Sequence, residues 1–298
     1  MDKILITGAN GFVGQHLTHE LTSNGIEVVG VGYSSDTPNM LSLDLTNPGE
    51  CSKLDFSHIF GVIHLAGLAA VGPSFADPMK YITTNMGIEV NLFEAALKQK
   101  ANPKFLVISS GSLYDPKAPL PLNEESSTIP SSPYAISKLG QEQIAQYYSK
   151  LGFKCIIARP FNHIGPNQGP GFIVPDLASQ IIKAKKDGSG EIKVGNLEAK
   201  RDYTDVRDIA RAYRLLLTKG KPGEVYNVCS GRSIDGQTIL KGLMAAAKVN
   251  LNPVIDQSKL RPTDNPDIYG SHQKLTKDTG WEPTISIDQT LKDVIESM

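Results

Sequence analysis

The sequence predicts an α/β protein built on a doubly wound parallel sheet. Short apolar runs without polar alternation recur through the first half of the chain, and amphipathic helical stretches separate them. Such runs suit strands that are buried on both faces, and the intervening helices suit right-handed crossovers between parallel strands. A glycine-rich turn follows the first apolar run directly, as expected where a first strand leads into a helix.

The elements of this sheet can be assigned in chain order. The predicted strands cover residues 3–8, 27–32, 61–67, 104–110 and 154–160. The predicted helices between them cover residues 14–25, 85–99 and 134–152.

The turn after the first strand reads "LITGANGFVG" and places Gly8, Gly11 and Gly14 at the start of a helix. Glycines allow the tight turn and the close approach of the backbone to a pyrophosphate whose charge faces the helix N-terminus. We therefore predict a dinucleotide site of the Rossmann kind here. The residues of the loop expected to contact the cofactor are Gly8, Asn10, Gly11, Phe12, Val13 and Gly14.

The pattern loosens after Pro160. Loops alternate with predicted helices over 174–188 and 205–220, and a further strand lies near 223–230. We expect residues 1–160 to form the dinucleotide-binding domain, to which the strand near 223–230 returns. Residues 161–298 are expected to form mainly a smaller, interleaved α/β substrate-binding domain.

Composition limits the kinds of partner. The 298 residues carry a formal net charge of −1, so no overall field recruits nucleic acid or an acidic membrane surface. No apolar run approaches the roughly 18 residues that span a bilayer, and the first residues begin a strand at once, which leaves no room for a signal peptide. Scattered Cys51, Cys155 and Cys229 indicate reduced thiols in a cytoplasmic protein.

The end of the second strand carries neither usual signature of cofactor choice. An acidic residue there would favour NAD and a basic one NADP, but the chain has Gly32, Tyr33 and Ser34. Because no acid at the strand end opposes a 2′-phosphate, and Ser34 or Ser35 can donate to one, we expect NADPH, with NADH possible. Asp36 is either a displaced acid or an ordinary turn residue. Further on, Asp44 and Leu45 are predicted to hold the adenine. A plain turn is the alternative role for Asp44.

"SPYAISK" places Tyr134 and Lys138 on one face of a helix. An ammonium group beside a phenol is expected to lower the phenol's pKa, so that the tyrosine exchanges a proton near neutral pH. The spacing alone is common, and a solvated helix face is its ordinary meaning. The glycine loop and a serine-bearing strand end about 24 residues upstream make the combination specific.

At this point the sequence resembles the short-chain dehydrogenase/reductase superfamily, in its extended nucleotide-sugar branch. The motifs "TGANGFVG", "HLAG", "SSGSLY", "YAISK", "RPFNHIGP", "KRDYTDVRD", "YNVCSG" and "LRPTDNP" occur in that family's order. The resemblance implies that Ser110 bonds the sugar's C4 oxygen, that Tyr134 exchanges the proton and that Lys138 holds the nicotinamide ribose. It also places Leu65, Ala66 and Asn85 at the cofactor. A helix N-cap is the alternative for Asn85, and His64 is expected to pack rather than react.

The resemblance further implies a nucleotide-diphosphate sugar as the substrate. Arg201 and Arg261 correspond to two arginines that contact the diphosphate, for which a guanidinium fork is suited; a surface salt bridge is the alternative for each. The helix that begins near Val174 presents N-terminal amides to phosphate oxygens. The full set of expected substrate contacts is Ser112, Tyr114, Asn162, Val174, Arg201 and Arg261. No metal is expected, and Asp205 and Asp208 are interpreted as orienting arginines or capping a helix.

Three reactions share this scaffold: 4-epimerisation, 4,6-dehydration and 4-keto reduction. Dehydratases need carboxylates where this chain has Gly111, Ser112 and Leu113, so dehydration is disfavoured. Several segments look most like the GDP-4-keto-6-deoxymannose reductases that make GDP-D-rhamnose, and NAD(P)H-dependent reduction at C4 is the predicted reaction. Reduction of a dTDP-, UDP- or CDP-linked sugar, 4-epimerisation, and a non-catalytic NAD(P)-sensing protein are the alternatives. A homodimer formed through helices like 86–100 and 134–151 is also expected.

Overall fold

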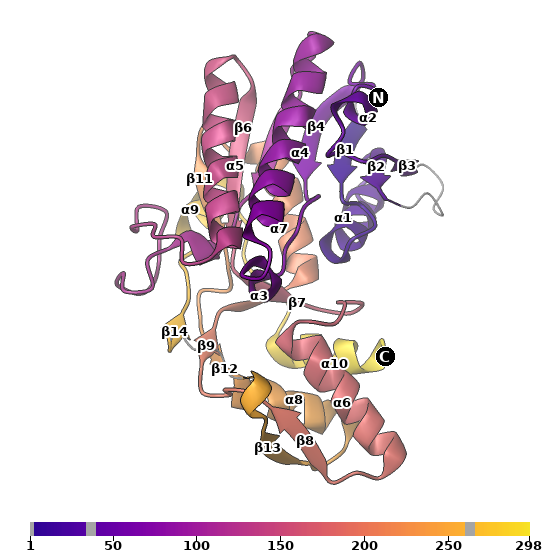
Figure 1. The fold of residues 1–298 in the computed structure, drawn as a ribbon, viewed down its shortest axis with the longest axis vertical. Helices are drawn as coiled ribbons and strands as arrows, with labels where there is room; N and C mark the ends of the chain where they lie inside the picture. The colour runs from indigo at the N-terminus through magenta and orange to yellow at the C-terminus, as the bar shows by residue number, and fades with distance from the viewer. Residues whose placement is uncertain (1–2, 34–39, 260–265) are drawn as a thin grey trace.

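A computed structural model describes residues 3–33, 40–259 and 266–298. Its centre is a seven-stranded sheet in which every neighbouring pair of strands is parallel, in the order β11-β6-β5-β4-β1-β2-β3 (Figure 1). In that order the strands are β11 (Val225–Val228), β6 (Lys154–Pro160), β5 (Lys104–Ile108), β4 (Ile59–His64), β1 (Lys3–Thr7), β2 (Val28–Gly32) and β3 (Met40–Ser42). The prediction of a doubly wound parallel sheet is confirmed.

Helices cover both faces of this sheet. One face packs against α1 (Phe12–Ser23), α7 (Val206–Lys219) and α9 (Gln273–Thr279), and the other against α2 (Pro48–Cys51), α4 (Pro78–Lys98) and α5 (Pro133–Lys150). The buried strand residues are apolar on both sides, which is what two covered faces require. None of the described helices is long and apolar enough to cross a membrane.

A smaller lobe lies beyond the carboxyl ends of the strands of the large sheet (Figure 1). Its core joins α6 (Ile173–Asp187), α8 (Gly236–Ala247) and α10 (Ile287–Glu296) to the parallel pair β8 (Glu191–Val194) and β13 (Asn252–Ile255). Shorter elements connect the two parts: α3 (Val71–Ser74), β7 (Asn162–Ile164), β9 (Lys200–Arg201), β10 (Tyr203–Asp205), β12 (Ile234–Asp235), β14 (Asp267–Ile268) and the 3-10 turns η1 (Gly111–Leu113) and η2 (Gln257–Lys259).

The chain passes between the two parts more than once. β11 pairs with β6 inside the large sheet, and α7 and α9 also pack on that sheet although they follow Pro160 in sequence. We therefore propose that the chain divides into two domains at residue 160, and that β11, α7 and α9 return to the first domain.

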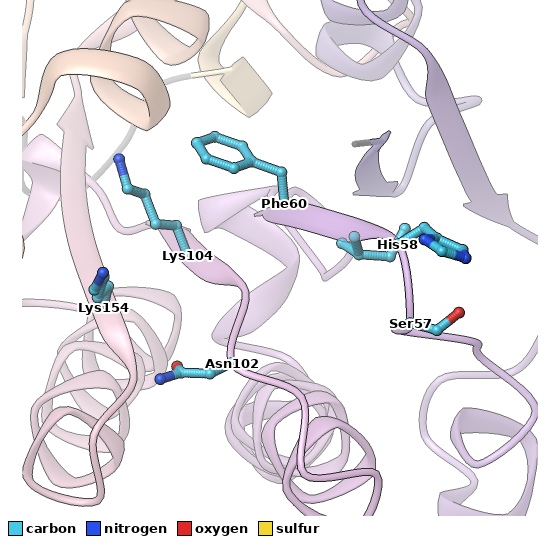
Figure 2. Close-up of a pocket in the computed structure, with 7 residues that line it drawn as sticks. Ser57, His58, Phe60, Asn102, Lys104 and Lys154 are labelled. Carbon is cyan, nitrogen blue, oxygen red and sulfur yellow. The ribbon is translucent and has the colours of Figure 1, made fainter. Parts of the chain in front are cut away.

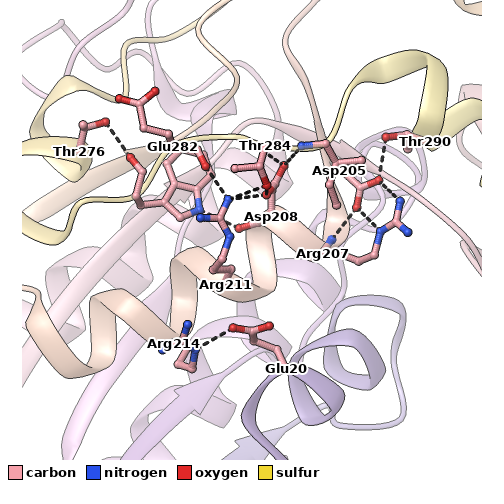
Figure 3. Close-up of polar contacts among 12 residues, drawn as sticks. Glu20, Asp205, Arg207, Asp208, Arg211, Arg214, Thr276, Glu282, Thr284 and Thr290 are labelled. Carbon is pink, nitrogen blue, oxygen red and sulfur yellow. Dashed lines mark hydrogen bonds and ion pairs between the residues drawn. The ribbon is translucent and has the colours of Figure 1, made fainter. Parts of the chain in front are cut away.

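Two carboxylates at the start of α7 tie the smaller lobe to the sheet (Figure 3). Asp205 caps α7, accepts from the Thr290 hydroxyl at 2.7 Å and pairs with Arg207. Asp208 is buried and accepts from the backbone N–H groups of Thr284 and Ile285, both at 2.9 Å. Asp205 therefore both caps a helix and pairs with an arginine, whereas Asp208 pairs with Arg211 at 2.5 Å, so each aspartate takes a role that the sequence predicted.

The Asp208 contacts generate a stability prediction. Asp208→Ala removes the carboxylate partner of Arg211 and leaves the partly buried N–H groups of Thr284 and Ile285 without their acceptor, so we expect the free energy of unfolding to fall by about 2 kcal/mol. Urea denaturation measures it, with Glu282→Ala, at an exposed side chain, as the control. A loss no larger than that of the control would contradict the assignment.

Candidate active site

The glycine loop between β1 and α1 leaves a backbone cradle at a helix N-terminus. Gly8 has a φ of +70°, and a Cβ there would lie 2.9 Å from the backbone nitrogen of Ala66. A Cβ at Gly14 would lie 2.2 Å from the carbonyl oxygen of Gly8, so no larger residue fits. Gly11 is the N-cap of α1, and no side chain caps the helix. The exposed N–H groups and the close backbone fit the pyrophosphate of a dinucleotide.

The other predicted loop residues surround this cradle. The side chain of Asn10 lies against Gly32 at the end of β2, because a Cβ at Gly32 would lie 2.5 Å from the Asn10 Oδ1 atom. Phe12 stacks on His163 with 6.2 Å between ring centroids, and Val13 packs against the sheet core. Only the backbone of Val13 is therefore suited to a ligand contact.

The adenosine end of the predicted site is partly described. Tyr33 is exposed, while Ser34, Ser35 and Asp36 lie outside the described residues. The Asp44 Oδ1 atom accepts from the backbone N–H and the hydroxyl of Thr46 at 2.9 and 2.7 Å, and these bonds lower the pKa of Asp44. This is the turn role that the sequence also allowed, and the adenine contact of Asp44 and of its buried neighbour Leu45 stays a prediction.

Ser110, Tyr134 and Lys138 come together at the carboxyl end of β5. Ser110 follows that strand, and its Oγ atom accepts from the backbone N–H and the hydroxyl of Ser112 at 3.1 and 2.9 Å. Tyr134 lies in the first turn of α5, which Ser132 caps by accepting from the Ala135 N–H. The three predicted catalytic side chains are all at most 9% exposed.

Burial decides the protonation of the pair on α5. It raises the pKa of Tyr134, and a hydrogen bond with Ser110 only partly offsets that rise. Burial lowers the pKa of Lys138 to about 8, although the carboxylates of Glu89 and Glu142 act in the opposite direction. At neutral pH the tyrosine therefore holds its proton and the lysine is mostly charged.

The expectation that Lys138 lowers the pKa of Tyr134 is wrong for this arrangement. The ammonium group lies 5.9 Å from the centre of the tyrosine ring. It donates instead to the carbonyl oxygen of Ile108 at 2.7 Å and to the Oε1 atom of Gln141 at 2.8 Å. Desolvation of the phenol thus outweighs any influence of the lysine charge.

Asn85 is fully buried in the middle of α4, so the N-cap alternative is wrong. Its side chain accepts from the Leu68 N–H at 2.7 Å, and donates to the Leu68 carbonyl at 3.1 Å and the Ser137 hydroxyl at 2.9 Å. Ser137 in turn donates to the Tyr134 carbonyl at 2.7 Å. Asn85 therefore links the loop after β4 to the turn of α5 that carries the tyrosine. A direct cofactor contact by Asn85 stays a prediction.

The loop after β4 borders the cradle. The N–H groups of Leu65 and Ala66 donate to the carbonyl and hydroxyl of Thr7 at 3.1 Å each. His64 contacts the same hydroxyl through Nδ1 at 2.8 Å. Burial and the Lys138 charge lower the pKa of His64 to about 3, so it stays neutral, in keeping with the packing role expected for it.

The predicted substrate residues lie along the junction with the smaller lobe. Asn162 is exposed on β7, which pairs with β10, and Arg201 lies on β9. The side chain of Val174 is buried in the core of the smaller lobe, so only its backbone N–H, in the first turn of the uncapped α6, suits a phosphate. Arg261 lies outside the described residues.

Tyr114, one of the predicted substrate contacts, is buried in the structure. Its hydroxyl donates to the Asn227 Oδ1 atom at 2.6 Å, and the Arg159 guanidinium lies 5.0 Å from its ring centre. Burial raises its pKa to about 12, so the phenol keeps its proton near neutral pH. A sugar contact by Tyr114 stays a prediction. Such a contact would use the ring, because the hydroxyl is already hydrogen-bonded to Asn227.

Sequence reasoning missed the buried polar side chains near Lys138. Glu89, Gln141 and Glu142 are at most 2% exposed, and Glu142 pairs with Arg159 through two hydrogen bonds of 2.8 Å. The sequence carried a signal for Gln141 and Glu142, because they stand three and four positions after Lys138, and side chains at these spacings are neighbours on a helix.

A shallow pocket at the opposite, amino-terminal edge of the sheet lies far from these groups (Figure 2). It is lined by Ser57, His58, Ile59, Phe60, Asn102, Lys104 and Lys154. In open parallel sheets ligands bind beyond the carboxyl ends of the strands, so this pocket is not part of the candidate site.

Comparison with known proteins gives a consistent family. The model of the NAD dependent epimerase/dehydratase family matches residues 4–229. The chain is 35% identical to GDP-6-deoxy-D-mannose reductase of Pseudomonas aeruginosa over 98% of this chain and 96% of that protein.

Solved structures agree. The structure of RMD from Pseudomonas aeruginosa complexed with NADPH superposes with a TM-score of 0.88 at 35% identity, covering 100% of this chain and 98% of that one. UDP-glucose 4-epimerase from Thermotoga maritima with UDP-glucose gives 0.89 at 27% identity, covering 99% and 98%.

The cradle generates a binding prediction. Gly14→Ala forces the loop apart, so we expect the affinity for a nicotinamide dinucleotide, followed by fluorescence titration, to fall at least about tenfold, or about 1.4 kcal/mol. Gly72→Ala is the matched control, because a Cβ there meets nothing within 4 Å. Equal affinities for the two variants would show that the loop does not hold the dinucleotide.

Proposed function

The chain belongs to the NAD dependent epimerase/dehydratase family, and we propose that it reduces the C4 keto group of GDP-4-keto-6-deoxy-D-mannose with NADPH, giving GDP-D-rhamnose. The observation that carries the proposal is the 35% identity to a GDP-6-deoxy-D-mannose reductase over nearly the full length of both chains. Reduction of a dTDP-, UDP- or CDP-linked keto sugar is the nearest alternative substrate choice.

The proposed site suits reduction better than dehydration. The turn after Ser110 holds Gly111, Ser112 and Leu113, which offer no carboxylate to move protons at C5 and C6 of the sugar. Ser112 instead donates its hydroxyl hydrogen to the Ser110 Oγ atom. Ser112 therefore does not use the Ser110 hydroxyl hydrogen, which in the proposed complex would bond the C4 oxygen beside Tyr134.

The protonation of Tyr134 is compatible with the proposed reduction. A reductase needs the tyrosine as an acid, and the raised pKa of Tyr134 keeps its proton in place at neutral pH.

The residues that would hold the cofactor fit NADPH. Gly8, Gly11 and Gly14 form the cradle for the pyrophosphate, and Lys138 would bond the nicotinamide ribose with a donor not used by Ile108 or Gln141. The cofactor supplies a hydride to C4. No described acidic side chain stands at the end of β2 to oppose a 2′-phosphate.

The chain's own residues carry the proton and the charge. Tyr134 gives its phenolic proton to the C4 oxygen as negative charge develops there, and the Ser110 hydroxyl stabilises that charge by a hydrogen bond. The charged Lys138 close behind stabilises the resulting phenolate until solvent returns the proton. The net change is one keto group reduced and one NADPH oxidised.

The nucleotide diphosphate would lie along the junction with the smaller lobe. Asn162, the N–H of Val174 and the guanidinium of Arg201 are the described candidates, and Arg261 is the further predicted contact.

We also propose a homodimer through α4 and α5, since an apolar groove lies between them. Its lining residues are Met86, Val90, Gly140, Gln143, Ile144, Tyr147 and Tyr148. A cytoplasmic location is proposed from the three buried, unpaired cysteines.

One observation favours a second candidate, UDP-sugar 4-epimerisation: the match to a UDP-glucose 4-epimerase structure at a TM-score of 0.89. An assay that follows nicotinamide absorbance with GDP-, dTDP-, UDP- and CDP-4-keto-6-deoxysugars separates the candidates. Stoichiometric loss of NADPH with the GDP sugar supports reduction. Interconversion of 4-hydroxy sugars without net cofactor loss supports epimerisation, and no turnover with any sugar supports the non-catalytic alternative.

The role of Tyr134 gives a sharper prediction. Tyr134→Phe removes the proton donor and keeps the ring, so we expect kcat to fall about 10²–10⁴-fold while the affinity for NADPH stays within about threefold. Tyr147→Phe, at an exposed tyrosine on the same helix, is the control and should keep the original rate. Unchanged turnover in Tyr134→Phe would exclude this tyrosine as the acid.

A further inference from the structure

The carboxylate of Asp202, between β9 and β10, is buried and bonds two segments that are distant in sequence. The residue is 1% exposed. Its Oδ1 atom accepts from the backbone N–H and the hydroxyl of Ser230, both at 2.7 Å. Its Oδ2 atom accepts from the N–H groups of Gly231 at 3.0 Å and Gly270 at 3.3 Å. Buried carboxylates are usually paired with a cation, whereas these four donors are all neutral, which calls for a physical explanation.

The contacts of Asp202 require both of its oxygens to accept. Burial raises the pKa of Asp202, and the hydrogen bonds from Ser230, Gly270 and Gly231 oppose that rise. A protonated carboxyl group would carry a hydrogen on one oxygen and lose part of its capacity to accept. The geometry therefore fits the ionised form. A side-chain amide cannot replace it, because the NH₂ group of an amide only donates.

Two of the four donors come from glycines at positions that suit no side chain. Gly231 has a φ of +81°, where a residue with a side chain is strained. A Cβ at Gly270 would lie 2.6 Å from the Cζ atom of Phe161 and 3.0 Å from the Cys229 sulfur. The lack of side chains lets both backbones approach the carboxylate. The surroundings of Asp202 are thus built so that N–H groups converge on one acceptor.

The carboxylate of Asp202 ties β9 to the large sheet. The strand β9 has two residues and pairs with β12 and β14 over two residues each, so its own ladders hold it by few hydrogen bonds. Ser230 and Gly231 follow closely after β11, which is the edge strand of the large sheet. Gly270 comes soon after β14. Asp202 therefore fastens the end of a short strand to two better-anchored segments.

The segment that contains Gly270 is joined in turn to the candidate active site. The backbone of Leu122 exchanges hydrogen bonds with residues 269 and 271, at 3.0 and 2.8 Å. The side chain of Asn227 donates to the Leu122 carbonyl at 3.0 Å and accepts from the hydroxyl of Tyr114, the residue that ends η1. Connected hydrogen bonds thus run from Asp202 to the turn that follows Ser110.

We propose that Asp202 is a positioning residue, which fixes Arg201 as a contact for the diphosphate of the nucleotide-linked substrate. Arg201 directly precedes Asp202 on β9, and its guanidinium donates to the Lys200 carbonyl at 2.7 Å. By fastening β9 to the large sheet, the carboxylate sets the distance between this guanidinium and the groups that act at C4. The inference rests on the proposed function for the role of Arg201, but the contacts of Asp202 are independent of the sugar.

Asp202→Asn tests the carboxylate at nearly constant volume. The amide turns one acceptor into a donor that faces other donors, so β9 loses its anchor. We expect the affinity for GDP, measured by isothermal titration calorimetry, to fall at least about tenfold. The affinity for NADPH, measured by fluorescence titration, should stay within about twofold, since the glycine loop lies between β1 and α1.

The matched control is Asp208→Asn. Asp208 is also 1% exposed and also accepts from two backbone N–H groups, but those groups lie at residues 284 and 285 and β9 is not among its contacts. Both variants should unfold at lower urea concentration than the original protein. Only Asp202→Asn should lose affinity for GDP, so the comparison separates positioning of Arg201 from a general loss of stability.

A double-mutant cycle tests whether Asp202 acts through Arg201. Arg201→Ala alone should weaken GDP binding, and adding Asp202→Asn to it should change the affinity by less than about twofold, because the guanidinium is already gone. If Asp202→Asn fails to fold, Ser230→Ala removes only the hydroxyl donor. It should give a smaller loss of GDP affinity, again only when Arg201 is present.

Equal losses of GDP affinity with and without Arg201 would overturn the inference, as would an unchanged affinity in Arg201→Ala or an equal fall in NADPH affinity. UDP, dTDP and CDP are titrated in parallel, so that a preference for another base still reports on the diphosphate. Binding of none of the four would also overturn it. These titrations need no turnover, so a failure to reduce any keto sugar would contradict the proposed function and leave the binding result standing.

Discussion

The hydrogen bond from the Lys138 ammonium group to the Ile108 carbonyl, at 2.7 Å, is the contact on which the candidate site depends. It joins α5, which carries Tyr134, to the end of β5, which leads directly into Ser110. Tyr134 and Ser110, the proposed acid and the proposed oxyanion donor, thus come from two elements that this buried hydrogen bond joins. Asn85 and Ser137 reinforce the same junction from α4.

The buried ammonium group of Lys138 lies among other buried polar side chains. Burial lowers the pKa of Lys138 to about 8, so the lysine is mostly charged at neutral pH. Two further side chains with carboxyl groups, Glu89 and Glu142, are buried in this part of the interior, although carboxylates are costly to bury. Glu142 is paired with the buried guanidinium of Arg159.

The sequence predicted the parts of the fold and site that follow from local rules. The unalternating strands, the glycine loop and the helical spacing of Tyr134 and Lys138 each reflect a local constraint, and the structure has the sheet and the buried constellation as expected. Sequence reasoning could not predict the deep burial of Tyr114. It also could not predict that Asn85 lies in the middle of a helix with both polar side-chain atoms hydrogen-bonded. Those features depend on contacts between elements distant in sequence. The lowered pKa expected for Tyr134 was wrong because helical proximity was weighed without burial.

The central proposal is that a hydride passes to C4 of the sugar while Tyr134 supplies the proton. Its most direct test uses NADPH deuterated at the transferring position of nicotinamide C4, with GDP-4-keto-6-deoxy-D-mannose and NMR of the product. The account predicts one deuterium at C4 of GDP-D-rhamnose for each NADPH consumed. Deuterium at any other carbon, or a sugar product formed without net NADPH consumption, would contradict it.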